Sequence, residues 1–246
     1  MGSNDPQVLI AGGGPVGLLC AWLLGRQGVR VRVFDNNDGL QDDPRAATTH
    51  PATLDLLSED GLADDMARVG LVAPIFQFWD RPSGELVAQF DHAILARDTA
   101  HPFVVQCEQF KTAKLVLERL GKIPNVEVLF GHEVVDVTQR GGAASVDVRG
   151  PDGLRTHTGA WLIGAEGGRS VVRKQSAIAF DGSPGRSASS CSPRPMISRP
   201  TAAIARAAIS PTRKPGAIAS RFRPTVRPAC GARCFRPIRR TPKSSS

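Results

Sequence analysis

The sequence has no apolar run of about 18 residues, the length at which a membrane-spanning helix becomes the expected interpretation, so no transmembrane segment is predicted. Its first residues are polar and its first apolar run is short, which predicts no signal peptide. No Ser/His/Asp triad can be placed, so no catalytic residue is assigned. The histidines show no ligand spacing and are expected on the surface or in loops: His50, His92, His101, His132 and His157.

The five cysteines give no zinc pattern. Cys230 and Cys234 form a loose C-x3-C pair, but no matching Cys or His pair completes a site, so no metal is predicted. Cys20 falls within an apolar helical pattern and is expected to be a small core residue. This use of cysteine fits a reducing, cytoplasmic setting.

Acidic residues are absent from the last quarter of the chain. Residues 1–182 contain 17 Lys/Arg and 23 Asp/Glu, a net charge of −6, whereas residues 183–246 contain 14 Lys/Arg and no acid, a net charge of +14. The second part also has ten prolines, eleven serines and no periodic apolar face. Such a segment cannot bury enough apolar surface to offset its chain entropy, so residues 183–246 are predicted to be a disordered tail.

Basic, Pro-rich tails can bind nucleic acid or anionic membranes. This tail lacks the interleaved aromatic residues of many nucleic-acid binders, since Phe222 and Phe235 are its only aromatics. The expected partner is therefore neither nucleic acid nor membrane. The sequence does not indicate an oligomeric state.

A strand, a helix and a second strand follow one another at the start of the chain. Gln7–Ala11 is a short apolar run before glycines, which is typical of a buried parallel strand. Pro15–Gln27 has apolar residues at helical spacing and is followed by Gly28, a residue suited to the C′ position of a helix. Val29–Phe34 is predicted to be the second strand. The three elements predict a right-handed βαβ unit.

The turn between the first strand and the helix carries the chemistry. Gly12 to Gly17 reads G-G-G-P-V-G, which fits G-x-G-x-x-G in the required strand-to-helix context. Gly12 allows the tight turn, Gly14 lets the backbone approach a pyrophosphate, and Gly17 allows close packing of the helix on the strand. The pyrophosphate is expected at the helix N-terminus, where Pro15 and Val16 begin the first turn.

Asp35 ends the second strand, where its carboxylate would accept hydrogen bonds from the adenosine ribose. A carboxylate there disfavours a 2′-phosphate, so NADP is not expected at this site. The fingerprint alone does not separate FAD from NAD. An NAD-binding Rossmann dehydrogenase and a non-catalytic nucleotide-binding protein therefore stay open as alternatives.

Further elements give an α/β chain with inserted strands. The predicted helices are Ala46–Leu57, Leu62–Val69 and Phe110–Gly121. The predicted strands are Leu71–Trp79, Glu85–Phe90, Val126–Phe130, Glu133–Gln139, Ala144–Arg149 and Trp161–Gly164. The expected architecture is a Rossmann-like domain over residues 1–182, followed by the tail of residues 183–246.

Val8–Asp35 resembles the N-terminus of the FAD-dependent monooxygenases of the para-hydroxybenzoate hydroxylase type. The run D-P-R-A-A at residues 43–47, followed by P-A-T-L at 51–54, resembles that family's P-R-A segment with its helix. The resemblance implies that Arg45 meets the FAD pyrophosphate region. The run Q-C-E-Q-F at residues 106–110 resembles the segment with the flavin-contacting glutamine, which is either Gln106 or Gln109.

Residues 162–173, L-I-G-A-E-G-G-R-S-V-V-R, resemble the family's second signature, G-A-D-G-x-x-S-x-V-R. This implies that Gly164, Glu166 and Gly167 lie beside the cofactor. Glu166 stands where the family has Asp, and its extra methylene displaces the carboxylate in a tight turn. The cofactor contact at this position is therefore expected to differ from that of the family.

The resemblance implies a flavoprotein that hydroxylates a phenolic or aromatic small molecule, with bound FAD and with NADH or NADPH as electron donor. The inserted strands would then be part of an incomplete substrate domain. The aromatic substrate and the choice between NADH and NADPH are not indicated.

The resemblance stops at about Asp181. The family continues with a string such as F-T-W-P-E-R-F-L-V, where this chain reads S-P-G-R-S-A-S-S, and the same bases encode both strings one position out of register. We therefore interpret the tail as a frameshifted reading that truncates the family sequence. A third family signature, a G-D motif that binds the ribityl chain, has no match in the tail, so weak FAD retention is expected.

Overall fold

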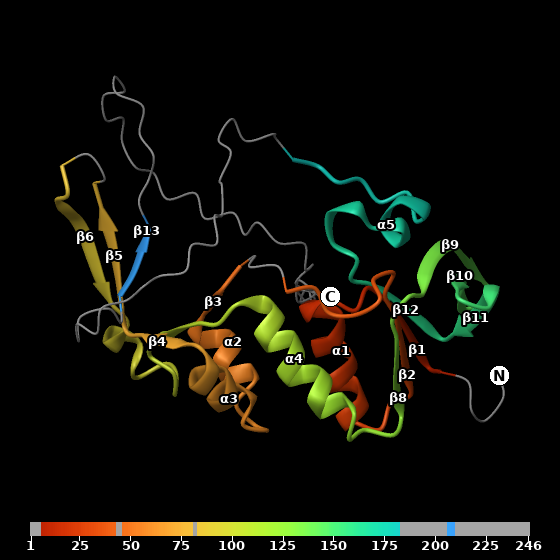
Figure 1. Ribbon diagram of the computed structural model, residues 1–246, viewed down its shortest axis with the longest axis horizontal. Coiled ribbons are helices and arrows are strands. Elements are labelled where there is room, and N and C mark those ends of the chain that lie inside the picture. The colour runs from red at the N-terminus through yellow and green to blue at the C-terminus, as the bar shows by residue number, and fades with distance from the viewer. Residues whose placement is uncertain (1–5, 43–45, 81–82, 183–205, 210–246) are drawn as a thin grey trace, which may run out of the picture. The chain divides into compact units, whose positions relative to one another are not determined.

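The computed structural model describes residues 6–42, 46–80, 83–182 and 206–209 (Figure 1). These residues all fall within one compact unit, Met1–Pro211. The domain boundary after residue 182 stays a prediction. None of the helices in these ranges is long and apolar enough to cross a membrane.

The described residues include a four-stranded parallel sheet, in the order β12-β1-β2-β8. Its strands are β1 (Val8–Ala11), β2 (Val31–Phe34), β8 (Val126–Leu129) and β12 (Trp161–Gly164), and every neighbouring pair is parallel. All four residues of β1 are buried, as expected for a strand covered on both faces. The predicted βαβ unit is confirmed.

One face of this sheet packs against α1 (Pro15–Arg26). Helix α4 (Gln109–Leu120) packs in turn against α1. Val8 and Ile10 point into this layer, together with Leu18 and Trp22 of α1. The helix approaches the sheet closely at Gly25, where an added Cβ would lie only 2.3 Å from Cγ2 of Val126 on β8. Gly28, at φ +77°, ends the helical segment as predicted.

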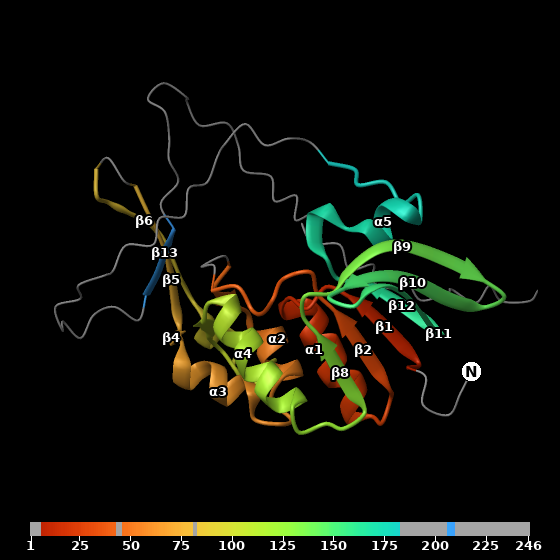
Figure 2. The ribbon, with the colours of Figure 1, turned by 45° about the vertical axis from the view of Figure 1, so that its right-hand side comes forward.

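The other face packs against an antiparallel meander of β9 (Glu133–Arg140), β10 (Ala143–Gly150) and β11 (Gly153–Gly159). Leu9, Ala11 and Phe34 point toward it and share a second core with Val146 and Val148. Figure 2 shows the meander beside the central strands. The alternation of side chains along β1 thus supplies two cores from one strand.

Two smaller sheets complete the described strands. One contains β3 (Thr48–Thr49), β7 (Val104–Gln106) and β4 (Leu71–Ala73), with β7 in the middle. The other contains β5 (Ile75–Trp79) and β6 (Leu86–Asp91), with β13 (Arg206–Ile209) on the outer side of β5. The remaining helices are α2 (Pro51–Leu56), α3 (Leu62–Val69), α5 (Val171–Gln175) and the 3-10 turns His92–Leu95 and Gly167–Arg169.

Two predicted elements exist with other bounds, and in each a proline sets the difference. The helix predicted over Ala46–Leu57 begins only at Pro51, while His50 is extended at φ −87° and ψ 160°, as residues before proline prefer. The strand predicted over Leu71–Trp79 is two strands that end and begin on either side of Pro74, which has no N–H for a ladder. Strands β3, β7 and β11 were not predicted.

The prediction of a structureless tail covers residues 183–246. Within that range the structure describes only Arg206–Ile209, and these residues form β13, parallel to β5. This short strand was not predicted. The rest of the tail lies outside the described residues, so its disorder and the frameshift stay predictions.

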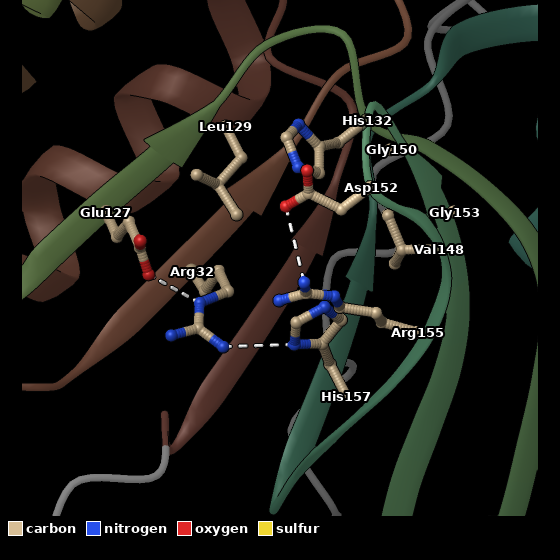
Figure 3. A pocket seen from close by; sticks show the side chains of 10 residues that line it. All are labelled: Arg32, Glu127, Leu129, His132, Val148, Gly150, Asp152, Gly153, Arg155 and His157. Carbon is tan, nitrogen blue, oxygen red and sulfur yellow. Dashed lines mark hydrogen bonds and ion pairs between the residues drawn. The ribbon is translucent and has the colours of Figure 1, made fainter.

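A hydrogen bond joins the parallel sheet to the meander (Figure 3). Nη1 of Arg32 on β2 lies 3.0 Å from Nδ1 of His157 on β11. His157, predicted on the surface or in a loop, lies in strand β11 and is half-buried. Its ring centroid lies 4.9 Å from that of Phe34. Arginine can only donate, so this contact requires an unprotonated Nδ1 on His157.

This geometry predicts a pH-dependent stability. Burial, and next the charge of Arg32, lower the pKa of His157 from its ordinary value. Below about pH 6.5 the unfolded chain takes up a proton on this side chain that the native state resists, so the free energy of unfolding falls there. Once the pH is below the lowered pKa of His157 in the native state, the free energy of unfolding falls no further from this cause.

Denaturant unfolding of the wild type and of His157→Gln between pH 5 and pH 8 measures this effect. The difference in stability between the two proteins should change with pH below about 6.5 and stay constant above it. His50→Gln, at an exposed histidine, is the matched control. A difference between wild type and His157→Gln that is the same at every pH would contradict the assignment.

Candidate functional site

The turn between β1 and α1 is built from backbone packed on backbone. Gly12 has φ +102°, and a Cβ there would lie 2.5 Å from the carbonyl oxygen of Ala165. A Cβ on Gly17 would lie 1.8 Å from the carbonyl oxygen of Gly12. Neither position accepts a side chain, which explains two of the three glycines of the fingerprint by packing inside the protein.

Gly14 differs from these two glycines. It is the N-cap of α1, at φ −73°, and a Cβ there would meet no described atom within 4 Å. The space in front of Gly14 is therefore open on the protein side. Pro15 follows as the first helical residue, where its missing N–H costs nothing.

The first turn of α1 faces this open space with unpaired donors. The first intrahelical bond runs from the N–H of Leu18 to the carbonyl of Gly14, at 3.0 Å. The N–H groups of Val16 and Gly17 precede it and have no acceptor within the helix. These donors and the positive end of the helix dipole suit an anionic diphosphate.

Asp35 is held at the end of β2 by three donors. Its Oδ2 accepts from the N–H of Gly13 at 2.7 Å. Its Oδ1 accepts from the N–H of Asn37 at 2.9 Å and from Nδ2 of Asn37 at 2.7 Å. The carboxylate therefore lies against the glycine turn, where sequence analysis expects the nucleotide ribose.

Neither partner of Asp35 was predicted from the sequence. Gly13 occupies the free position of G-x-G, yet a Cβ there would lie 3.0 Å from Cβ of Asp35. The run of three consecutive glycines was a signal for this close approach. Asn37 carries no motif, and no feature of the sequence singled it out.

The second glycine turn, after β12, meets the first. The N–H of Ala165 donates to the carbonyl of Ala11 at 2.7 Å, and Gly12 packs on the backbone of Ala165. Gly164 is confined as well, since a Cβ there would lie 3.0 Å from Cβ of Val172. Gly167 has φ +76°. The structure thus brings two of the predicted groups of site residues into contact.

Glu166 does not project freely from this turn. Its Oε2 accepts from Oγ of Ser170 at 2.5 Å, and its Oε1 accepts from the N–H groups of Val171 at 2.8 Å and Val172 at 3.2 Å. The carboxylate thus accepts from the first two amides of α5. Glu166 therefore fixes the path of the second turn.

The two candidate glutamines lie on elements away from both glycine turns, Gln106 on β7 and Gln109 on α4. Oε1 of Gln106, at the end of β7, accepts from Oγ1 of Thr48 at 2.9 Å. Gln109 begins α4, and its N–H donates to the carbonyl of Ala46 at 3.1 Å. Both residues adjoin the segment that follows Arg45, but Arg45 itself lies outside the described residues. The structure does not choose between the two glutamines.

A polar cavity of about 290 Å³ lies elsewhere, between β2, β8 and the meander (Figure 3). Its charged groups are paired, with Arg32 on Glu127 at 2.6 Å and Arg155 on Asp152 at 3.3 Å. None of its lining residues belongs to either glycine turn, so it is not the nucleotide site. The described residues contain no group of three or more His, Cys, Asp or Glu that could hold a metal ion.

Comparisons with known proteins agree on one family. Residues 5–214 match the family described as FAD binding domain. Para-nitrophenol 4-monooxygenase from Pseudomonas sp. (strain WBC-3) is 33% identical over 175 residues, which cover 71% of this chain and 43% of that protein. 6-Methylpretetramide 4-monooxygenase from Streptomyces rimosus is 36% identical over 180 residues, or 73% of this chain and 32% of that protein.

The solved structures that resemble this chain include a monooxygenase and a hydroxylase with bound FAD. A crystal structure of p-nitrophenol 4-monooxygenase from Pseudomonas putida DLL-E4 matches with a TM-score of 0.69 and 36% identity, covering 72% of this chain and 45% of that one. A ternary complex of aklavinone-11 hydroxylase with FAD and aklavinone matches with a TM-score of 0.64 and 28% identity, covering 72% of this chain and 36% of that one. The chain thus spans less than half the length of these relatives.

The glycines of the first turn predict two different mutant phenotypes. Gly17→Ala places a methyl group 1.8 Å from the Gly12 carbonyl oxygen and should lower the free energy of unfolding by about 3 kcal/mol. Gly14→Ala meets open space and should cost less than about 1 kcal/mol, the loss of a favourable N-cap residue. Only the second variant keeps the fold while blocking a ligand at the backbone.

Denaturant unfolding of both variants, with titration by ADP, measures this difference. Gly14→Ala should unfold at nearly the wild-type denaturant concentration and bind ADP more weakly. Gly28→Ala tests a glycine with φ +77° far from the turn and should not change binding by the folded protein. Equal ADP affinity of wild type and Gly14→Ala would show that no phosphate lies against this backbone.

Proposed function

The chain belongs to the FAD binding domain family, and on that basis we propose that it binds FAD as part of an NAD(P)H-dependent monooxygenase that hydroxylates an aromatic or phenolic small molecule. Both curated relatives named above are monooxygenases. The activity of the whole protein is a proposal, because this chain spans less than half of the relatives' length.

The open space at Gly14 is the observation that carries this proposal. Gly12 and Gly17 are glycines because protein backbone fills the space of their side chains, whereas nothing described fills that space at Gly14. A diphosphate fits there, on the donors of Val16 and Gly17 and beside Pro15. Asp35, one strand away, is placed to accept from a ribose hydroxyl.

The remaining predicted site residues take their roles from the family. In this proposal Gly164, Glu166 and Gly167 shape the turn beside the cofactor, with Glu166 acting through its hold on α5. Gln106 or Gln109 faces the flavin, and Arg45 meets the diphosphate. Bound FAD supplies the redox chemistry of this class, with NADH or NADPH as electron donor and O2 as oxygen donor. The protein binds and orients the cofactor and the substrate, and it excludes water from the site.

Residues 1–246 on their own should retain FAD weakly. The tail has no match to the family's ribityl-binding signature, so the adenosine half of the cofactor is expected to supply most of the affinity. Hydroxylation by the 246-residue chain should be slight or absent. An aromatic substrate and a cytoplasmic location remain predictions.

Titration of the purified chain with FAD, ADP and NAD, followed by desalting and an absorbance spectrum, tests the proposal. We expect FAD and ADP to compete for one site, FAD to leave on desalting, and 4-nitrophenol to be hydroxylated slowly or not at all. Gly14→Ala provides the control for binding at the turn.

Other outcomes separate the alternatives. Tight binding of NAD without FAD would favour a dehydrogenase. A stoichiometric yellow protein that hydroxylates 4-nitrophenol would contradict the expected weakness of this chain. The absence of binding by any adenine nucleotide would overturn the proposed function as a whole.

A further inference from the structure

We propose that Asn37 is a second ribose-binding residue, and that Asp35 and Asn37 each accept one of the two vicinal hydroxyls of the adenosine ribose. This inference rests on the proposed function and deepens it, because it names the group that receives the second hydroxyl. The chemical class of ligand is a nucleotide with both ribose hydroxyls free.

The hydrogen bonds already made by Asp35 limit what it can do for a ligand. An ionised carboxylate has about four acceptor positions, two on each oxygen. Oδ1 already accepts two hydrogen bonds, from the N–H and the Nδ2 of Asn37. Oδ2 accepts one, from the N–H of Gly13. One position is left, on Oδ2, so Asp35 can accept from a single ribose hydroxyl.

The second hydroxyl needs another acceptor, and Asn37 has one beside this carboxylate. Its Nδ2 lies 2.7 Å from Oδ1 of Asp35, which settles the orientation of the amide, because the reverse orientation would place two oxygens together. The carbonyl oxygen of the Asn37 side chain therefore points away from Oδ1. The side chain is exposed, so this acceptor is open to solvent and to a ligand.

Backbone hydrogen bonds from the loop after β8 hold the backbone of Asp35 and Asn37 in position. The N–H of Gly131 donates to the carbonyl of Asn37 at 2.8 Å, and the N–H of His132 donates to the carbonyl of Asp35 at 2.8 Å. The segment after β2 is thus tied to the loop after β8. A preorganised acceptor contributes more to affinity than one that has to be ordered on binding.

The pair also excludes a phosphate on the ribose. Asp35 and the side-chain oxygen of Asn37 are acceptors, and a 2′-phosphate, largely a dianion at neutral pH, has few protons to donate to them. It would also lie against the negative charge of Asp35. The site should therefore distinguish ADP from its 2′-phosphorylated form.

Binding of three probes to two proteins tests the assignment. The probes are ADP, 2′-deoxy-ADP and 3′-deoxy-ADP, and the proteins are the full wild-type chain and Asn37→Leu. Leucine has nearly the shape of asparagine, so it removes the hydrogen-bonding atoms but keeps bulk beside Oδ1. In the wild type each deoxy analogue should bind about 3–10-fold more weakly than ADP, the value of one hydrogen bond.

The variant should lose the preference for one hydroxyl only. In Asn37→Leu we expect ADP to bind about 3–10-fold more weakly than in the wild type, and one of the two deoxy analogues to bind as well as ADP does. That analogue identifies the hydroxyl that Asn37 receives. Asn37→Val also keeps bulk beside Oδ1 without hydrogen-bonding atoms, and it should give the same pattern if the leucine variant does not fold.

A control variant and two contrary outcomes of these titrations separate this inference from the proposed function. Gln41→Ala lies in the same exposed segment and removes a contact to the Gly39 carbonyl, so it should leave all three affinities unchanged. If Asn37 only steadies Asp35, ADP and both analogues weaken by one common factor, and the inference is overturned while nucleotide binding stands. If the wild type binds no ADP, the proposed function and this inference both fail.

Discussion

Everything at the nucleotide end of this protein depends on the Gly12 carbonyl oxygen lying where a side chain of Gly17 would be. That contact lets α1 begin directly behind β1, and it turns the first amides of the helix toward open space at Gly14. The same Gly12 packs on Ala165, so the turn after β12 is fixed relative to the first. Close packing of backbone on backbone therefore sets the position of the helix amides that a diphosphate would use.

Charge enters this frame through Asp35, and the glycine turn determines how that charge is presented. Gly13 approaches closely enough to donate to one carboxylate oxygen, while Asn37 occupies the other. A similar device recurs after β12, where the Glu166 carboxylate gathers the first amides of α5. In both turns an acidic side chain satisfies backbone donors that the tight geometry leaves without partners.

The sequence predicted the β1–α1–β2 unit closely, because a wholly buried strand, a glycine turn and an acid at fixed spacing admit few other arrangements. Prediction failed where proline interrupts an apolar pattern, at Pro51 and Pro74, and at β11, whose residues are mostly exposed and polar. The role of Glu166 could not be predicted, because its partners on α5 are defined by the folded path of the chain. Asn37 belongs to no sequence pattern, and its proposed role as an acceptor was inferred only from the orientation of its side-chain amide.

Backbone amide shifts in a ¹⁵N-labelled chain titrated with ADP report whether a nucleotide binds at the glycine turn. We expect the amides of Gly14, Val16 and Gly17 to shift together and to saturate at one ADP per chain, while those of Gly153 and Arg155 at the polar cavity do not move. Shifts at Gly153 and Arg155 with none at the glycine turn would contradict this expectation.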